Sequence, residues 1–410
     1  MTLGTLFWVS GGCVSARKLD TRVDDAFGRG DYAAATQYLE DGVKRQGEEG
    51  KDALLYLMDL GLTQHTRGDY GSSTRTLLKA DQMAEIKDYT SLSREASTLL
   101  VSDTTKPYKG EDFEKVLINS YLALNFALQE DYESALVEAR KVNRKLYLMV
   151  NEGKRNYQQS AFARYLSALL FESSGQFNDA YVDYKLTREL MPGWKRLGED
   201  LYRMAYLLRM PDEMERWQKE YQLAEEDRQQ ALELTRGKPR PGELIVIFQN
   251  GISPVKVPNP DFHSVPMFRA RRNPVRAAEV RVDGRYLGAT EVLHDIESTA
   301  IQNLRDNTAG IIAKKIGGAF AKGMVGAGVA RATKNEGLGE LVNLVLYVAD
   351  QADTRSWALL PRDLQILRAP LAEGDYDVEV HPVRSGRKPF RQRVKVTSGK
   401  RTWVNIRYVP

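Results

Sequence analysis

Few residues of this chain have the types and spacing that catalysis or metal binding requires. The chain has one cysteine, Cys13, and four widely separated histidines, His65, His263, His294 and His381. Disulfide frameworks and thiolate zinc clusters need several cysteines, so both are excluded. No nucleophile motif surrounds a serine, and Gly326-Ala327-Gly328 lacks the Lys-Ser/Thr ending of a phosphate-binding loop. We therefore predict no catalytic site, metal or cofactor; the alternative is an envelope hydrolase of glycans or peptides with an unrecognised site.

Cys13 is better placed for lipid modification than for catalysis. It follows an apolar run at residues 3–9 and the flexible turn Ser10-Gly11-Gly12. This order resembles the end of a bacterial lipoprotein signal peptide, in which the cysteine is acylated and becomes the mature N-terminus. Three acyl chains would make a stable membrane anchor; the alternative is an ordinary cysteine. Val14 follows instead of the aspartate that favours inner-membrane retention, so we expect the periplasmic side of the outer membrane.

The elements that must position any site belong to a chain with the composition of folded domains. Its 410 residues are 42% hydrophobic and 28% charged, which excludes disordered, collagen-like and polytopic membrane proteins. Residues 1–238 carry 33 basic and 38 acidic side chains, whereas residues 239–410 carry 26 and 17. This asymmetry indicates that the two halves meet different partners.

Four short motifs predict a helical repeat array over residues 20–237, after a signal and tether at 1–19. In each motif an aromatic residue follows a turn, and a small residue comes three positions later. The pairs are Tyr32 and Ala35, Tyr70 and Ser73, Tyr132 and Ala135, and Phe177 and Ala180. Residues three apart share a helix face, so we expect each pair to be buried where the two helices of a hairpin cross.

The repeats resemble tetratricopeptide repeats in their turn and in their close-packed small residue. A glycine ends the first helix and an aspartate caps the second, as in Gly30-Asp31 and Gly68-Asp69. The aromatic anchors lie 38, 62 and 45 residues apart, where regular repeats would give about 34, so the array is degenerate. Stacked hairpins present a concave surface that binds peptides or proteins. A generic helical bundle is the alternative.

A linker at residues 238–242 separates this array from a predicted mixed β domain at 243–410. Its proline and glycine residues stop a helix, and the apolar run Leu244–Phe248 then indicates a strand. A long helix is predicted from Glu291 to about Thr333, with small residues at four-residue intervals. Such spacing favours close packing, here against the sheet, or alternatively in an oligomer or at a membrane. Four basic residues interrupt the segment and argue against insertion into a bilayer.

The C-terminal segment should form an antiparallel sheet, after a further apolar helix at 338–348. Apolar residues alternate around Val378, Val394 and Val404, with turn residues between the runs. From Arg384 onward the chain has nine basic residues and no acidic one. Arg391, Arg393 and Lys395 share one face by the period of two, which makes them a candidate surface for anions. Solvated outer faces of terminal strands are an equally good interpretation.

Nucleic-acid binding would use these basic strands together with Phe390 and Trp403. The expected periplasmic address argues against it, so we predict no nucleic-acid partner.

Several longer motifs resemble a family of bacterial outer-membrane lipoproteins with degenerate tetratricopeptide-like repeats. They cover Pro107 to Lys115, Glu138 to Leu146, Gly242 to Lys256 and Asp353 to Pro361. These motifs are specific to the family but carry no known reaction. The resemblance implies a lipid-anchored α+β protein that works with protein partners in the envelope, including other lipoproteins. The expected function is a non-catalytic protein-binding scaffold or assembly factor.

Overall fold

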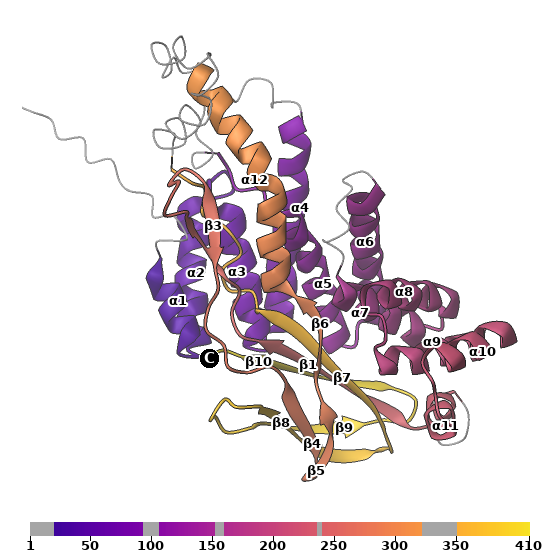
Figure 1. Ribbon diagram of the computed structural model, residues 1–410. Helices are drawn as coiled ribbons and strands as arrows, with labels where there is room; N and C mark the ends of the chain where they lie inside the picture. The colour runs from indigo at the N-terminus through magenta and orange to yellow at the C-terminus, as the bar shows by residue number, and fades with distance from the viewer. Residues whose placement is uncertain (1–19, 93–105, 152–159, 236–239, 322–350) are drawn as a thin grey trace, which may run out of the picture.

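The computed structural model describes residues 20–92, 106–151, 160–235, 240–321 and 351–410 of the chain. This part has three layers (Figure 1): an array of helices, a four-stranded mixed sheet and a four-stranded antiparallel sheet. We call the two sheets the middle sheet and the outer sheet. The predicted class, α+β with an N-terminal helical repeat array, is confirmed.

The described helices of the first layer form five consecutive hairpins and a closing helix. Their bounds are α1 (Thr21–Gly28), α2 (Tyr32–Gln46), α3 (Ala53–Thr66), α4 (Tyr70–Leu92), α5 (Asp112–Leu128), α6 (Tyr132–Asn151), α7 (Ala161–Ser173), α8 (Phe177–Leu190), α9 (Lys195–Leu207), α10 (Pro211–Glu220) and α11 (Glu225–Glu233). The helices α3, α5 and α7 form what we call the inner face of the array, because their side chains contact the middle sheet.

The repeat motifs mark the start of every second helix from α2 to α8. The four small residues, Ala35, Ser73, Ala135 and Ala180, are fully buried. Three aspartates cap the second helices, and Asp31 illustrates this by accepting a hydrogen bond from the backbone N–H of Ala34 at 3.0 Å. The preceding residue has a positive φ in each hairpin, and in the third hairpin Glu130 occupies the position that glycine holds elsewhere.

The four aromatic residues, which were expected to be buried at the hairpin crossings, are half-buried. Tyr32, Tyr70, Tyr132 and Phe177 are the first residues of their helices, so they lie at the edge of the array and not at its centre. Their rings pack against the core from this edge. The physical reason is their position beside the turn, where one side of the ring faces away from the hairpin.

The middle sheet has the strand order β10-β1-β7-β6, and the outer sheet has the order β5-β4-β8-β9. Strand β1 is parallel to β10 and antiparallel to β7. The bounds are β1 (Gly242–Asn250), β4 (Ala278–Val282), β5 (Arg285–Ala289), β6 (Glu291–Asp295), β7 (Asp363–Leu371), β8 (Gly374–Pro382), β9 (Phe390–Val396) and β10 (Arg401–Tyr408). A separate hairpin of β2 (Val255–Pro258) and β3 (Pro266–Arg269) packs near α12 (Ile296–Ala321).

Alternation along β1 explains why the middle sheet lies between two layers. Ile245 and Ile247 belong to the core shared with the helices, whereas Leu244, Val246 and Phe248 belong to the core shared with the outer sheet. Successive strand residues point to opposite faces, so a strand that is apolar on both faces must be covered on both. All nine residues of β1 are buried accordingly.

Two predictions about the β half are wrong. The helix expected from Glu291 begins at Ile296, because residues 291–295 pair with β7 as β6 and Asp295 caps the helix through the N–H of Ser298 at 2.9 Å. The last strand does not continue the β8–β9 sheet; β10 crosses to the middle sheet and pairs in parallel with β1. Val404 and Ile406 face the outer sheet, whereas Trp403 packs towards the helices between the polar residues Arg401 and Asn405.

The expected helix at 338–348 lies outside the described residues. Residues 322–333 of the long helix predicted from Glu291, which carry part of its small-residue pattern, lie outside them as well. Among the helices that are described, none combines the length and hydropathy needed to cross a membrane.

Candidate functional site

The chain's own β half covers the inner face of the array, the surface that such arrays commonly offer to ligands. Alternate residues of β10 contact successive hairpins. The Arg407 guanidinium lies over the Phe27 ring at 5.7 Å, and Asn405 donates to His65 Nε2 at 2.9 Å. Arg401 donates to the backbone oxygen of Leu169 at 2.5 Å. The last strand therefore occupies the place of a bound peptide along this face.

A first polar junction between array and sheet is centred on His65. The Asn125 side chain donates from Nδ2 to Ser73 Oγ at 2.8 Å, so its Oδ1 accepts from His65 Nδ1 at 2.5 Å. The other ring nitrogen then accepts from Asn405, and from Gln249 Nε2 at 2.7 Å. Burial lowers the pKa of His65 to about 4. The imidazole is therefore neutral and holds helices and sheet together.

A second junction joins the Pro107 to Lys115 motif to the Asp353 to Pro361 motif. The buried Glu114 carboxylate accepts hydrogen bonds from the Tyr108 hydroxyl at 2.6 Å and from the Trp357 backbone N–H at 2.7 Å. Burial and the neighbouring Glu111 raise the pKa of Glu114 to about 7. Two motifs that lie far apart in the sequence thus meet in one buried contact.

Two ion pairs flank this second junction. Lys256 Nζ lies 2.9 Å from Glu111 Oε1 and 5.9 Å from the centre of the Phe268 ring. Arg355 bridges to Asp52 on the helical side at 3.3 Å. Both pairs cross between array and β half, so they fix the relative position of the layers.

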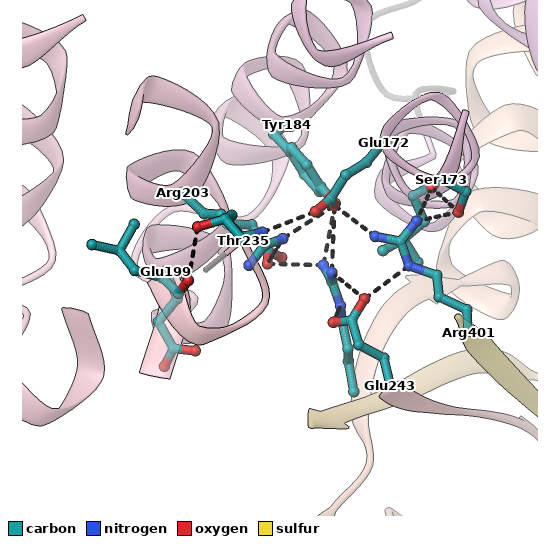
Figure 2. A network of polar contacts seen from close by, with 12 residues as sticks. Glu172, Ser173, Tyr184, Glu199, Arg203, Thr235, Glu243 and Arg401 are labelled. Atoms are coloured by element: carbon teal, nitrogen blue, oxygen red, sulfur yellow. Dashed lines mark hydrogen bonds and ion pairs between the residues drawn. The ribbon is translucent and has the colours of Figure 1, made fainter. Parts of the chain in front are cut away.

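A third junction, which we call the seam network, consists of Glu172, Asp200, Glu243, Arg203, Arg368 and Arg401 (Figure 2). Arg368 lies 2.6 Å from Glu243 and 2.8 Å from Asp200, and Arg401 lies 2.9 Å from Glu172. Three guanidinium groups thus meet three carboxylates where α7 and α9 contact β1, β7 and β10, and the ion pair of Arg196 with Glu199 lies beside them, with Arg196 3.8 Å from Glu243. The network balances its own charge inside the protein.

The electrostatics of the seam network follow from this balance. Burial alone would raise the pKa of Glu243, but Arg368 and Arg401 outweigh burial and lower it to about 2. Neighbouring arginines likewise outweigh burial at Glu172 and hold its pKa well below its usual range, with Arg203 as the strongest neighbour. Carboxylates with such low pKa values are poor proton acceptors, so the network is suited to holding layers together and not to acid–base catalysis.

One serine and one histidine lie within reach of each other at the array–sheet contact. Ser160 Oγ is 3.0 Å from His294 Nδ1, but both residues are buried and Ser160 caps α7 through the Ala163 N–H. Within the described ranges, no group of three histidine, cysteine, aspartate or glutamate side chains could hold a metal ion.

An open groove of about 820 Å³ lies beside the seam network, and we call it the seam groove. Its inner wall includes Glu172, Glu243 and Arg401 of the network. The rest of the lining comes from the third and fourth hairpin turns, the ends of α9 and α11, the two residues before β1, strands β9 and β10, and the turn between these strands. These residues are Ala127, Leu128, Glu130, Tyr132, Ser173, Gly175, Phe177, Leu207, Leu234, Thr235, Arg240, Pro241, Lys395, Thr397, Gly399, Lys400, Thr402 and Trp403. Two of the predicted repeat aromatics, Tyr132 and Phe177, thus border an open surface.

The predicted basic strip lies on one exposed face, but its charge is offset. Arg391, Arg393 and Lys395 stand directly opposite Glu379, Asp377 and Asp375 of β8 in the strand register. Opposite charges at directly paired positions attract each other, and Arg391 lies 2.8 Å from Glu379. Lys395 is the member of the strip that lines the seam groove. Its role in anion binding remains a prediction, and Cys13 lies outside the described residues.

Sequence reasoning missed the seam network and the groove. A signal was present, because Glu243 and Arg368 interrupt strands that are otherwise strongly apolar. Charges on strands that are covered on both sides must find buried partners. Which partners they find depends on contacts between residues far apart in the chain, such as Glu172 and Arg368.

Comparison with known proteins gave structural likenesses only. No protein-family model matches the chain, and no curated protein matches it. The crystal structure of MamA covers 53% of this chain and 93% of its own length, with 14% identity and a TM-score of 0.34. A MamA structure from Desulfovibrio magneticus RS-1 covers 49% and 87%, with 14% identity and a TM-score of 0.32.

YrrB, described as a TPR protein with an unusual peptide-binding site, covers 55% of this chain and 93% of its own. Its identity is 10% and its TM-score is 0.36. The repeat architecture of this chain is shown by its own consecutive helical hairpins and their turns.

Proposed function

We propose that this protein is a non-catalytic lipoprotein of the bacterial outer membrane that acts as a protein-binding scaffold or assembly factor in an envelope complex. The position of Cys13 after an apolar run and a glycine turn supports the anchor. The motifs shared with envelope lipoproteins support the family. A helical repeat array supports a role in binding other proteins, which include further lipoproteins.

The observation that carries the proposal is the combination of a filled inner face and an open groove. Because β10 covers the inner face, a partner must dock elsewhere on the described surface. The seam groove offers half-buried apolar residues such as Leu128, Phe177 and Leu207 beside exposed charges. The lining thus combines apolar side chains with charged and polar groups, as many protein-docking surfaces do.

The anchor is tested by metabolic labelling with palmitate and by membrane fractionation. We expect label in the native protein and none in Cys13→Ser, which should leave the outer-membrane fraction. Val14→Asp provides a second test, since it should move the lipidated protein to the inner membrane. Unlabelled native protein in the cytosol would refute the proposed location.

Docking is tested with a photo-crosslinking amino acid placed in the intact protein at Thr402, which lines the groove, and at Gln37, an exposed position on α2. We expect one protein to be captured in the envelope from Thr402 and not from Gln37. Equal capture at both positions, or none at Thr402, would contradict the proposal. Deleting residues 20–237 is a poorer test, because it would expose Ile245, Ile247 and Trp403, which share a core with the helices.

A further inference from the structure

We infer that the seam groove binds an extended, acidic segment of a partner protein, with apolar side chains between its carboxylates. This inference rests on the docking role proposed above. The groove is built from the ends of elements. Its lining comes from the third and fourth hairpin turns, from the end of α11, from residues 240–241 before β1 and from the start of β10. A volume of about 820 Å³ is in the range of clefts that enclose a ligand of several residues.

The charges of the groove divide into two sets. Glu172, Glu243 and Arg401 are paired within the seam network, so they offer a partner little net charge. The remaining charged residues of the lining are exposed: Arg240, Lys395 and Lys400 are basic, and Glu130 is acidic. In the described part of the chain, the three cations form no ion pair with a carboxylate. All three lie near the β9–β10 turn, where the Ser398 hydroxyl donates to the Arg240 backbone oxygen at 2.6 Å, so this side of the groove carries positive charge that a carboxylate-bearing segment would complement.

The apolar side chains favour a peptide over a simple polyanion. Leu128, Phe177 and Leu207 are half-buried in the free protein, and a ligand side chain laid over them would remove apolar surface from water. Inorganic polyphosphate or a phosphate group would leave this apolar surface exposed to water. The backbone of the segment should lie along the start of β10, where the Thr402 hydroxyl donates to the Lys395 backbone oxygen at 3.1 Å and can accept from a backbone N–H of the segment. The partner is therefore recognised by alternating acidic and apolar residues.

The test measures fluorescence anisotropy of labelled decapeptides with the full-length lipidated protein in detergent. The first peptide alternates aspartate with leucine and phenylalanine; the second replaces aspartate by asparagine, and the third replaces the apolar residues by serine. We expect binding of the first peptide that weakens with salt, and losses of at least about tenfold in affinity for the other two. Inorganic polyphosphate should not displace the first peptide at equal charge concentration.

The protein variants locate the binding. Lys395→Glu combined with Lys400→Glu should weaken the first peptide by about tenfold or more, because two attractive contacts become repulsive. Arg384→Glu combined with Lys388→Glu is the matched control, since both residues are exposed on the same β half and neither lines the groove. Equal loss with both variants, or equal binding of the asparagine peptide, would overturn the inference. If a partner is crosslinked at Thr402 but the protein shows no preference for the acidic peptide, this inference alone is refuted. If no partner is crosslinked at Thr402 and the acidic peptide is not preferred, the docking role is refuted as well.

Discussion

Replacing Glu243 by glutamine removes one negative charge from the seam network and keeps the shape of the side chain. Arg368 and Arg401, which lie 2.6 Å and 2.9 Å from its carboxylate, then share two carboxylates with Arg203 where there were three. Removing one partner of a buried ion pair leaves an uncompensated charge and typically costs about 3–5 kcal/mol. The change should therefore loosen the contact between helices and middle sheet.

The pKa of Glu243 gives an independent magnitude. It falls from 4.5 in the unfolded chain to about 2 in the folded protein, which corresponds to about 3 kcal/mol of stability at pH 7. Because the folded pKa is the lower one, this contribution is complete above pH 4.5 and is lost as the pH falls towards 2. At pH 3 about 1 kcal/mol should remain. The difference between native protein and Glu243→Gln should shrink in the same way.

Urea unfolding followed by tryptophan fluorescence measures this difference, since Trp357 and Trp403 are buried at the array–sheet contact. We expect Glu243→Gln to lower the free energy of unfolding by about 3 kcal/mol at pH 7 and by about 1 kcal/mol at pH 3. Glu291→Gln is the control, because Glu291 is exposed at the edge of the same sheet, and it should cost less than about 0.5 kcal/mol. A cost below about 1 kcal/mol at pH 7, or a cost independent of pH, would refute our reading of the network.

Two further outcomes are expected. In NMR titrations the imidazole rings of His65 and His294 should stay neutral until the pH approaches their folded values of about 4, because burial disfavours the charged form; protonation near pH 6.5 would contradict their burial. Gly61→Ala should destabilise the second hairpin by about 1–2 kcal/mol in chemical unfolding, because its Cβ would lie 2.5 Å from Leu77. Gly28→Ala, with open space at the same atom, should be neutral or slightly stabilising; equal effects of the two changes would show that packing does not limit Gly61.

Local features of the fold could be predicted from the sequence. The helices α2, α4, α6 and α8 begin at the four aromatics named from the motifs, because turn, cap and helix start depend on neighbouring residues. The turn at Asp283-Gly284 likewise joins β4 to β5 with two positive φ angles, as the Asp-Gly pair predicts.

Contacts between distant segments could not be predicted. The apolar alternation of β10 indicates a strand, but it does not say whether the strand pairs with β9 or with β1. The covering of the inner face follows from that pairing, because the pairing lays β10 against helices that were expected to be open to a partner. The helix predicted from Glu291 began too early for a related reason, since residues 291–295 form a strand only through their pairing with β7.

The parallel pairing of β1 with β10 also constrains how the polypeptide matures. The helices precede β10 in the chain, so the sides of α3, α5 and α7 that face the sheet stay uncovered until β10 has paired with β1. Contacts of such long sequence separation slow folding and leave unfinished molecules prone to aggregate. Loss of the β1–β10 pairing would therefore leave the sheet-facing sides of α3, α5 and α7 open to aggregation.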